Sequence, residues 1–337
     1  VLSGVQPTGV LHIGNYIGAL SLWAQQQDEF QNYFMIADMH ALTVPENVKA
    51  KGLRANARSV AALYIASGID PDKNVIFRQS SVTAHAYLAW ILTCCTPMGW
   101  LERMTQFKTK AEQTESVGTG LFTYPALQAA DILLYNADYV PVGEDQRQHV
   151  ELTRDIAARF NHLFGKCFRL PDGLYRTSGA RVMGFDDPTA KMSKSIAETH
   201  PGHAVNLLDP PNVVKKTIMS AVTDTSNEAR FEHASPGVRN LLELYEVLTK
   251  QDRGQIEAQF HGKGYGSLKS AVVEVVNETL RPIQETYKHI TEEPGYLDAL
   301  LASGAERAGV VAERTLKRAM SRAIDFDRPT MPSLAAA

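Results

Sequence analysis

The chain opens with the stretch VLSGVQPTGVLHIGNYIGAL, residues 1–20, which indicates the fold class of its first half. A short apolar run is followed by a glycine-rich turn and then by a helical pattern. Glycine between a strand and a helix lets the backbone approach a phosphate closely, and the unpaired N–H groups of the helix start attract an anion. The stretch therefore predicts a nucleotide site at the first strand–helix turn.

The glycine spacing argues against two common nucleotide-binding motifs. The dinucleotide motif needs G-x-G-x-x-G, whereas the glycines here lie at positions 4, 9, 14 and 18. The first two have the opening spacing of a phosphate loop, but Val10 and Leu11 follow where that motif needs lysine and a hydroxyl residue. We therefore expect neither a dinucleotide oxidoreductase nor a phosphate-loop hydrolase.

The segment HIGN, residues 12–15, supplies the remaining polar groups of this turn. His12 and Asn15 are three residues apart, so they share one helix face and can donate hydrogen bonds to phosphate or ribose oxygens. Alternatively, Gly14 only allows close packing of the helix on the sheet, and His12 is an ordinary surface residue. These residues alone leave both interpretations open.

Short apolar runs alternate with longer helical patterns through the first half of the chain. We expect strands at Val1–Val5, Tyr33–Ala37, Val75–Phe77 and Tyr139–Val142. Apolar residues at spacings of four, four and three then predict a helix with one buried face, formed by Leu152, Ile156, Phe160 and Leu163. This alternation predicts an α/β fold with a parallel sheet covered by helices on both faces. Ligands bind such sheets at the carboxyl ends of the strands.

The second half has a different pattern. After about residue 185, strand signals are nearly absent, and apolar residues recur at helical spacing between residues 272 and 290. Small residues, mostly alanine, form a similar stripe between residues 305 and 323. We therefore expect a smaller all-helical part after the α/β part.

Composition limits the possible partners and sites. The formal net charge is −3, so any RNA must bind a local basic patch rather than a generally basic surface. Cys94, Cys95 and Cys167 lack the spacing of a zinc site or a disulfide framework, and we expect reduced, mostly buried thiols in a cytoplasmic protein. No segment is apolar and long enough to suggest a membrane span, and no targeting peptide is evident.

Two short signatures and several longer blocks carry a family resemblance. HIGN at 12–15 resembles the first signature of class I aminoacyl-tRNA synthetases, and KMSKS at 191–195 matches their second signature at all five positions. The blocks ERMTQFK, AADILLY and VPVGEDQRQHVELTRDIAARFN resemble those of bacterial tryptophanyl-tRNA synthetases most closely. The resemblance covers nearly the whole chain.

The resemblance implies a domain organisation and a set of partners. It implies a Rossmann catalytic domain at residues 1–190 that ends in the KMSKS loop at 191–195. A helical tRNA anticodon-binding domain is then expected at 196–290, a C-terminal helix packing back on the catalytic domain at 291–330, and a frayed tail at 331–337. It further implies a cytoplasmic homodimer that binds tRNA(Trp) and no membrane.

The resemblance also implies a two-step reaction. L-Tryptophan and Mg-ATP form tryptophanyl-adenylate and pyrophosphate, and the acyl group then moves to the terminal ribose of tRNA(Trp). The implied catalytic residues are His12, Asn15, Lys110, Lys191 and Lys194. The implied ATP-binding residues are Gln6, Pro7, Thr8, Gly14, Asn15, Gly143, Glu144, Asp145, Val182, Lys191, Met192, Ser193, Lys194 and Ser195. Because no fixed metal site is expected, Mg²⁺ would arrive with ATP.

The implied tryptophan-binding residues are Asp131, Tyr124, Gln146, Gln128, His40 and Leu2. Asp131 is the expected acceptor for the indole N–H, which is the only polar group of that ring, while Tyr124 and Gln146 match positions that hold the α-amino group. Two alternatives stay open at this stage. For Asp131, the alternative is a carboxylate at a helix start that interacts with the helix dipole. For His40, the alternative is that it caps the following helix rather than lining the pocket.

Four residues depart from the family pattern. Leu2 stands where an aromatic residue is usual, Gln128 replaces a methionine, Met39 replaces the commoner glutamine, and Ile196 replaces an acidic residue. Three of these changes fall around the amino-acid pocket, so our hypothesis is that the pocket admits polar or ring-substituted tryptophans. The alternatives are a tyrosine-activating relative and a synthetase paralogue with an auxiliary binding or regulatory role.

Overall fold

The computed structural model describes residues 1–112, 116–175 and 181–324 of the chain. Its first half contains a parallel sheet in the order β1-β2-β3, formed by β1 (Leu2–Val5), β2 (Tyr33–Ile36) and β3 (Val75–Arg78). A second parallel pair joins β4 (Tyr139–Val142) to β5 (Asp172–Tyr175), and β4 lies beside β1. All four expected strands are confirmed, and the α/β class with them.

The expectation missed β5 because its sequence carries little strand signal. Its four residues are DGLY, none of which is buried, so neither an apolar run nor an alternating pattern marks it. Backbone pairing with β4 therefore makes this segment a strand.

The sheet lies between two hydrophobic cores. In β2 all four residues are buried, as expected for a strand covered on both faces. Phe34 and Ile36 pack into one core with α4 (Ala50–Ala66), whereas Tyr33 and Met35 pack into the other. The second core is covered by four helices, α5 (Ala84–Cys95), α8 (Thr119–Leu134), α9 (Arg147–Phe164) and α15 (Pro294–Ala323).

The first strand–helix connection has an unusual helix. His12 is the N-cap of α1 (Ile13–Asn15), which continues through a π-helical turn, η1 (Tyr16–Leu20), into α2 (Ser21–Gln25). The helix expected after the glycine-rich turn is thus present, with one widened turn near its start.

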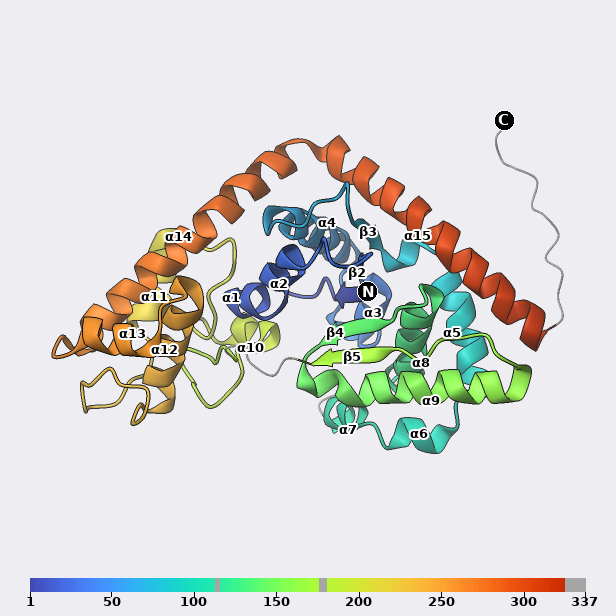
Figure 1. Cartoon of the computed structure of the whole chain (residues 1–337), viewed down its shortest axis with the longest axis horizontal. Helices are drawn as coiled ribbons and strands as arrows, with labels where there is room; N and C mark the ends of the chain where they lie inside the picture. Colours follow the sequence, from blue (N-terminus) through green and yellow to red (C-terminus); the bar gives the residue numbers. More distant parts are fainter. Residues whose placement is uncertain (113–115, 176–180, 325–337) are drawn as a thin grey trace.

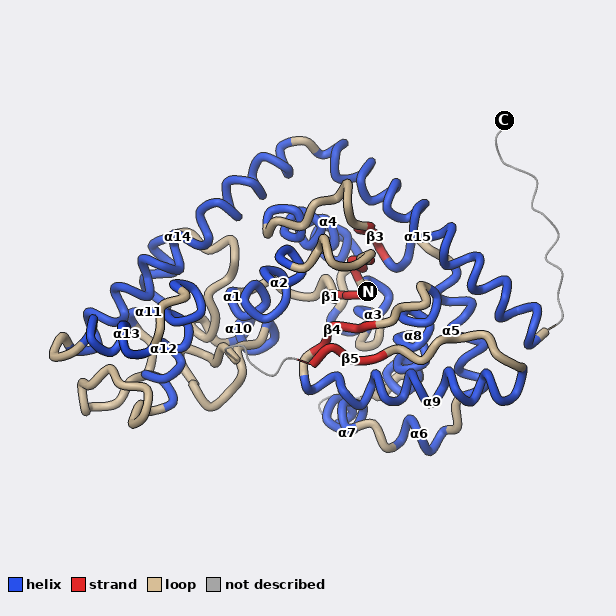
Figure 2. The backbone as a smooth tube through the Cα atoms, viewed as in Figure 1, coloured by secondary structure: helices blue, strands red, loops and turns tan. Residues whose placement is uncertain are grey.

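Shorter elements complete the first half. They are α3 (Asp38–Ala41), η2 (Pro45–Asn47), η3 (Gln79–Ser81), α6 (Met98–Glu102), α7 (Thr105–Glu112) and η4 (Glu144–Gln146). The second half contains α10 (Lys194–Thr199), α11 (Pro211–Met219), α12 (Pro236–Thr249), α13 (Arg253–Phe260) and α14 (Gly264–Glu292). Figure 2 shows the strands gathered in one half of the molecule. The described part of the chain from α11 to α14 contains helices and loops but no strand.

The two longest helices connect these halves. Figure 1 shows α14 and α15 meeting at an apex and descending on opposite sides of the molecule. α14 packs on α11, α12 and α4, while α15 packs on β3, α5 and α8. The last helix therefore returns to the sheet. Within the described residues, no helix is long and apolar enough to cross a membrane.

Two sequence expectations about burial are wrong. Leu163 is 48% exposed, although Leu152, Ile156 and Phe160 of the same stripe are buried, because Phe164 packs against the core in the last turn of α9 instead. Cys94 is exposed while Cys95 and Cys167 are buried. Cys94 and Cys95 are adjacent in α5, so their side chains point about 100° apart, and only Cys95 packs into the core here.

We predict that α15 tolerates no side chain at Gly304. A Cβ there would overlap the backbone carbonyl oxygen of Ile76 in β3, whereas a Cβ at Gly309 of the same helix meets open space. Gly304→Ala should lower the free energy of unfolding by about 3 kcal/mol through overpacking. The matched Gly309→Ala should raise it by about 0.5–1 kcal/mol, because alanine favours a helix interior.

Urea denaturation of both variants measures these changes. Equal effects at the two positions would show that α15 does not approach β3 this closely.

Candidate active site

Two loops that lie far apart in the sequence meet beside the carboxyl end of β1. The Lys194 Nζ atom donates a hydrogen bond to the backbone carbonyl of Gln6 at 3.2 Å. Gly9 has a positive φ of 64°, and a Cβ at that position would lie 3.1 Å from the Lys194 Cβ. The glycine therefore allows both the turn and the approach of the second signature. Pro7 of the same turn is buried and Thr8 is exposed.

His12 is buried at the start of α1 rather than exposed on the surface. Its side chain is 4% exposed, and its Nδ1 atom has no partner among the described residues. Burial, together with the positive charges of Lys194 and Lys191, lowers the pKa of His12 to about 3. His12 is therefore a neutral donor and acceptor near pH 7 and cannot act there as a cation.

Gly14 and Asn15 determine how His12 is held. The Asn15 side-chain oxygen accepts a hydrogen bond from the backbone N–H of His12 at 3.0 Å. A Cβ on Gly14 would lie 3.0 Å from the His12 Nδ1 atom, so this glycine leaves room for the ring. The interpretation of His12 as an ordinary surface residue is therefore wrong.

The KMSKS loop carries one half-buried lysine, Lys194, and one exposed lysine, Lys191. Burial lowers the pKa of Lys194 to about 8, which keeps it mostly charged at neutral pH. Lys191 is exposed, and its Nζ lies 3.8 Å from the Asp145 Oδ1. Met192 and Val182 are both buried and are joined by a backbone hydrogen bond of 3.1 Å. Ser193 caps α10 by accepting the Ile196 N–H at 3.3 Å; the Ser195 side chain lies outside the described part.

One acidic side chain just after β4, that of Asp145, faces Lys191. Burial alone would raise the pKa of Asp145, but a hydrogen bond from Gln146 and the charge of Lys191 lower it overall. Gly143, two residues before it, leaves room for this carboxylate, because a Cβ there would lie 2.8 Å from the Asp145 Oδ1. Glu144 is instead paired with Arg147 at 2.5 Å.

One cavity of about 250 Å³ collects all six expected amino-acid-binding residues. Its lining includes Leu2, His40, Tyr124, Gln128, Asp131 and Gln146, together with Gln6 and Lys110 from the nucleotide side. It opens where β1, β2 and β4 end, which is the position expected for a ligand of a parallel sheet. Hydrophobic residues such as Met35, Ile132 and Val140 form much of its remaining wall.

Asp131 is the most heavily hydrogen-bonded group of this cavity. It is 1% exposed; His40 Nε2 lies 2.7 Å from its Oδ2, and His85 Nδ1 lies 2.6 Å from its Oδ1. Gln79 donates a further bond to Oδ1 at 2.8 Å. Burial would raise the pKa of Asp131, but the two histidines lower it overall, so the carboxylate is ionised. Because a carboxylate has about four acceptor positions, it can still accept one more donor.

Both alternatives for Asp131 and His40 can now be decided. Asp131 lies near the C-terminal end of α8, so it is not a helix-start carboxylate. His40 lies in the last turn of α3, lines the cavity and contacts Asp131, so it does not cap a following helix. Sequence reasoning missed His85 and Gln79, because a lone buried histidine or glutamine carries no motif, and it named no role for Tyr135 although this residue ends the block AADILLY. His85 Nε2 lies 2.8 Å from the Tyr135 hydroxyl and completes this network.

Tyr124, Gln146 and Gln128 form the polar part of the wall. The Tyr124 hydroxyl lies 2.7 Å from His149 Nε2, and burial raises the pKa of this tyrosine to about 12. The Lys110 Nζ lies 5.3 Å from the centre of the Tyr124 ring, and burial lowers the pKa of this lysine. Gln128 is half-buried and makes no hydrogen bond to another described residue.

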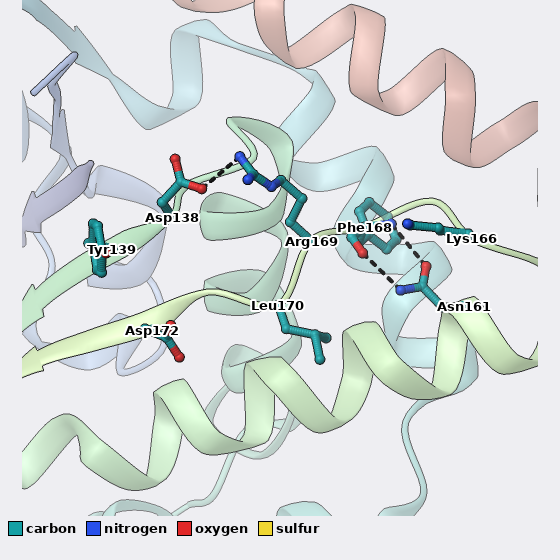
Figure 3. A pocket seen from close by; sticks show the side chains of 8 residues that line it. All are labelled: Asp138, Tyr139, Asn161, Lys166, Phe168, Arg169, Leu170 and Asp172. Atoms are coloured by element: carbon teal, nitrogen blue, oxygen red, sulfur yellow. Dashed lines mark hydrogen bonds and ion pairs between the residues drawn. The ribbon is translucent and has the colours of Figure 1, made fainter.

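A larger hollow lies at the opposite ends of β4 and β5. It measures about 560 Å³ and is lined by paired charges, such as Asp138 with Arg169 at 2.6 Å (Figure 3). Asn161 bonds the backbone of Phe168 on its floor. Three of its four charged side chains, Asp138, Arg169 and Asp172, are already paired within the protein, and it faces the amino ends of the strands, so it is the weaker candidate for a ligand site. No group of three His, Cys, Asp or Glu among the described residues could hold a metal ion.

Comparisons with known proteins find relatives over nearly the whole chain. The family profile "tRNA synthetases class I (W and Y)" matches residues 1–281. A tryptophan--tRNA ligase of Wolinella succinogenes is 49% identical over 323 residues, which cover 96% of this chain and 97% of that protein.

Solved structures extend the likeness to the whole fold. A tryptophanyl-tRNA synthetase of Campylobacter jejuni, complexed with ADP and tryptophan, is 36% identical with a TM-score of 0.83, covering 95% of this chain and 98% of that one. One from Mycoplasma pneumoniae is 37% identical with a TM-score of 0.86, covering 95% and 96%.

We predict that His12 makes stability fall as the pH is lowered. Its pKa is about 3 when folded and about 6.5 when unfolded, so the unfolded state binds the proton first as the pH drops. Between pH 7.5 and 5, the wild type should lose about 2 kcal/mol more free energy of unfolding than His12→Asn does. Asparagine is a good N-cap and does not titrate.

Urea titrations at the two pH values give this difference, with the exposed His289→Asn as the matched control. Parallel losses in all three proteins would contradict the burial of His12.

Proposed function

The chain belongs to the class I tRNA synthetases for tryptophan and tyrosine, and from that premise we propose how its own residues perform the reaction. Its activity is that of a tryptophan–tRNA ligase, the name carried by curated proteins about half identical to it over nearly its whole length. A tyrosine-activating relative and a purely auxiliary paralogue are not favoured by these likenesses. The observation that carries the proposal is the cavity around Asp131, whose lining residue Gln6 accepts a hydrogen bond from Lys194 of the KMSKS loop.

The first step is attack of the tryptophan carboxylate on the α-phosphate of ATP. One carboxylate O–P bond forms, the bond to the bridging oxygen breaks, and pyrophosphate leaves with that electron pair. Negative charge therefore builds on the transferred and leaving groups, and cations placed beforehand stabilise it. Lys191 and Lys194 supply this charge from the KMSKS loop, and Lys110 supplies it from α7.

The first turn and the start of α1 hold the nucleotide. Gln6, Pro7 and Thr8 lie in the turn, where Gly9 lets the chain approach Lys194 closely. Neutral His12, whose Nδ1 lacks a partner among the described residues, is available to a phosphate or ribose oxygen. Residues 143–145, 182 and 191–195 complete this side as the resemblance implies. Mg²⁺ fits as an ion carried by the phosphates and water, because the described residues offer no metal cluster.

The cavity selects the amino acid through one buried carboxylate. The remaining acceptor position of Asp131 takes the indole N–H, and the two histidines keep the carboxylate ionised and fixed in orientation. When the Tyr124 hydroxyl donates to His149, its oxygen can accept a hydrogen bond from the α-ammonium group. Gln146 is the second partner of that group.

The larger organisation follows the same proposal. Residues 1–190 form the catalytic domain, residues 196–290 bind the tRNA(Trp) anticodon, and residues 291–330 return to the sheet. A cytoplasmic location fits a reaction whose substrate is tRNA.

We further propose a homodimer. Tyr87, Trp90 and Cys94 form an exposed stripe on α5, and the exposed Met98 begins α6 next to it. Trp90 is 69% exposed, and an apolar patch of this kind is typical of a protein interface. A second copy of the chain would bury it.

We predict that Lys194 sets the alkaline limit of adenylate formation. Its pKa of about 8 means that the ammonium is lost as the pH rises from 7.5 to 9. Lys194→Met should lower kcat for tryptophan-dependent ATP–pyrophosphate exchange about a hundredfold at pH 7.5, since a transition-state contact is removed. Lys194→Arg keeps its charge, so its rate should not fall over this pH range.

Lys51→Met, an exposed lysine on α4, is the control. The role of Lys194 is refuted if Lys194→Met keeps the wild-type kcat. Exchange with each of the twenty amino acids tests the function itself: tryptophan alone should support it, and tyrosine as the preferred substrate would overturn it.

We predict that Gln128 widens the choice of tryptophan analogues. Its amide lines the cavity without a partner among the described residues, so it can bond a hydroxyl group on the indole ring. Gln128→Met should lower the exchange rate with 5-hydroxytryptophan, relative to tryptophan, by about tenfold. An unchanged ratio of the two rates would exclude Gln128 from this role.

A further inference from the structure

The second signature begins on a small hairpin. Met183 and Lys191 form a β-bridge, and the Met192 N–H donates to the Val182 carbonyl at 3.1 Å. Gly184 N–H donates to the Ala190 carbonyl at 2.9 Å, just before the turn. The position of the Lys191 backbone therefore depends on how this hairpin, residues 182–192, is held.

His203 holds the hairpin from the loop that leads to α11. It is fully buried, and its Nδ1 lies 2.6 Å from the Asp186 Oδ1 at the turn. Its Nε2 lies 3.4 Å from the backbone carbonyl oxygen of Lys191, the first residue of the signature. The backbone carbonyl of His203 accepts the Phe185 N–H at 3.0 Å. His203 thus contacts the hairpin at three places: Asp186 in the turn, Phe185 just before it, and Lys191 near the end of the hairpin.

Gly184 and His203 form a matched pair. A Cβ on Gly184 would overlap the imidazole ring of His203. The φ of Gly184 lies outside the left-handed region, so the space taken by the ring, and not the backbone conformation, requires glycine here. A small apolar side chain at 203 would leave this space empty and the Asp186 contact unmade.

The ring has acceptors at both nitrogens. A neutral imidazole can donate to one of these oxygens and an imidazolium to both. The titratable groups around it are the carboxylates of Asp186 and Asp187 on the turn and the neutral imidazole of His12 on the nucleotide side. The ring therefore joins an acidic turn to the backbone that carries the ATP-site lysine.

We propose that His203 is a positioning residue for ATP. It fixes the carbonyl of Lys191 and so the placement of the KMSKS loop against the first turn, where Lys194 bonds Gln6. The inference rests on the proposed role of Lys191 and Lys194 in ATP binding. It assigns His203 no contact with either substrate. It predicts that loss of the His203 side chain raises KM for ATP and leaves KM for tryptophan unchanged.

Three substitutions separate the two ring contacts. In His203→Asn the amide can occupy the place of Nδ1 and reach Asp186, whereas in His203→Gln it can occupy the place of Nε2 and reach the Lys191 carbonyl. His203→Ala removes both. Exposed His200, three residues earlier, gives the matched control His200→Gln.

The readouts are KM for ATP, KM for tryptophan and kcat in ATP–pyrophosphate exchange, with Tm measured alongside. His203→Ala should raise KM for ATP about tenfold, as expected for one lost hydrogen bond, and leave KM for tryptophan unchanged. His203→Gln should restore KM for ATP to within about threefold of the wild type, as expected for a kept hydrogen bond, and His203→Asn should restore it less. His200→Gln should match the wild type.

A purely structural role gives a different result. The inference would be overturned if the variants had a lowered Tm but a KM for ATP within about twofold of the wild type, since that change is smaller than the loss of one hydrogen bond would cause. It would also be overturned if asparagine restored KM for ATP better than glutamine does. Lys191→Ala distinguishes this failure from failure of the proposed function. If Lys191→Ala leaves KM for ATP and kcat unchanged, the proposed role of Lys191 is wrong, and the inference falls with it. The glutamine and asparagine variants keep the test decisive where alanine does not fold.

Discussion

The nucleotide side of the site depends on one contact between distant parts of the chain. The Lys194 ammonium donates to the backbone carbonyl of Gln6, which joins the second signature to the turn after β1. Everything around this contact is arranged to permit it: Gly9 omits a side chain, and burial lowers the pKa of Lys194 without discharging it at neutral pH. The same burial and the nearby lysines keep His12 neutral. Positive charge is therefore concentrated on the lysines of the KMSKS loop, and the start of α1 carries no charged histidine.

The amino-acid side depends on a buried carboxylate. Taking a charge out of water is costly unless hydrogen bonds compensate for it, and Asp131 has three such partners from three different elements. His40 comes from α3, Gln79 from η3 and His85 from α5. These donors fix the orientation of the carboxylate and leave it one acceptor position, which we propose takes the indole N–H. In the proposed function, selectivity for tryptophan is thus a property of the whole network, with Asp131 as the proposed contact to the ligand.

Much of the fold could be predicted from the sequence because it rests on local pattern. The apolar runs at β1, β2, β3 and β4 mark strands without reference to any neighbour. The strand β5 could not be predicted because only its pairing with β4 makes it a strand. The exposure of Leu163 and Cys94 could not be predicted because it depends on what packs nearby. The site follows the same division. Residues inside signatures could be named, whereas His85, Gln79 and His203 lie in segments without a motif.

The sequence by itself determined the alternation of strands and helices, the family signatures and the chemical types present at each. Only the tertiary structure decided which of these groups meet. It placed His12 in the interior, surrounded Asp131 with two histidines, and set His203 between Asp186 and the Lys191 carbonyl. The physical reason is that burial, pKa and hydrogen-bond partners are properties of neighbours in space. Residues 91 or 188 positions apart, such as His40 with Asp131 or Gln6 with Lys194, become neighbours only when the sheet and its loops are assembled.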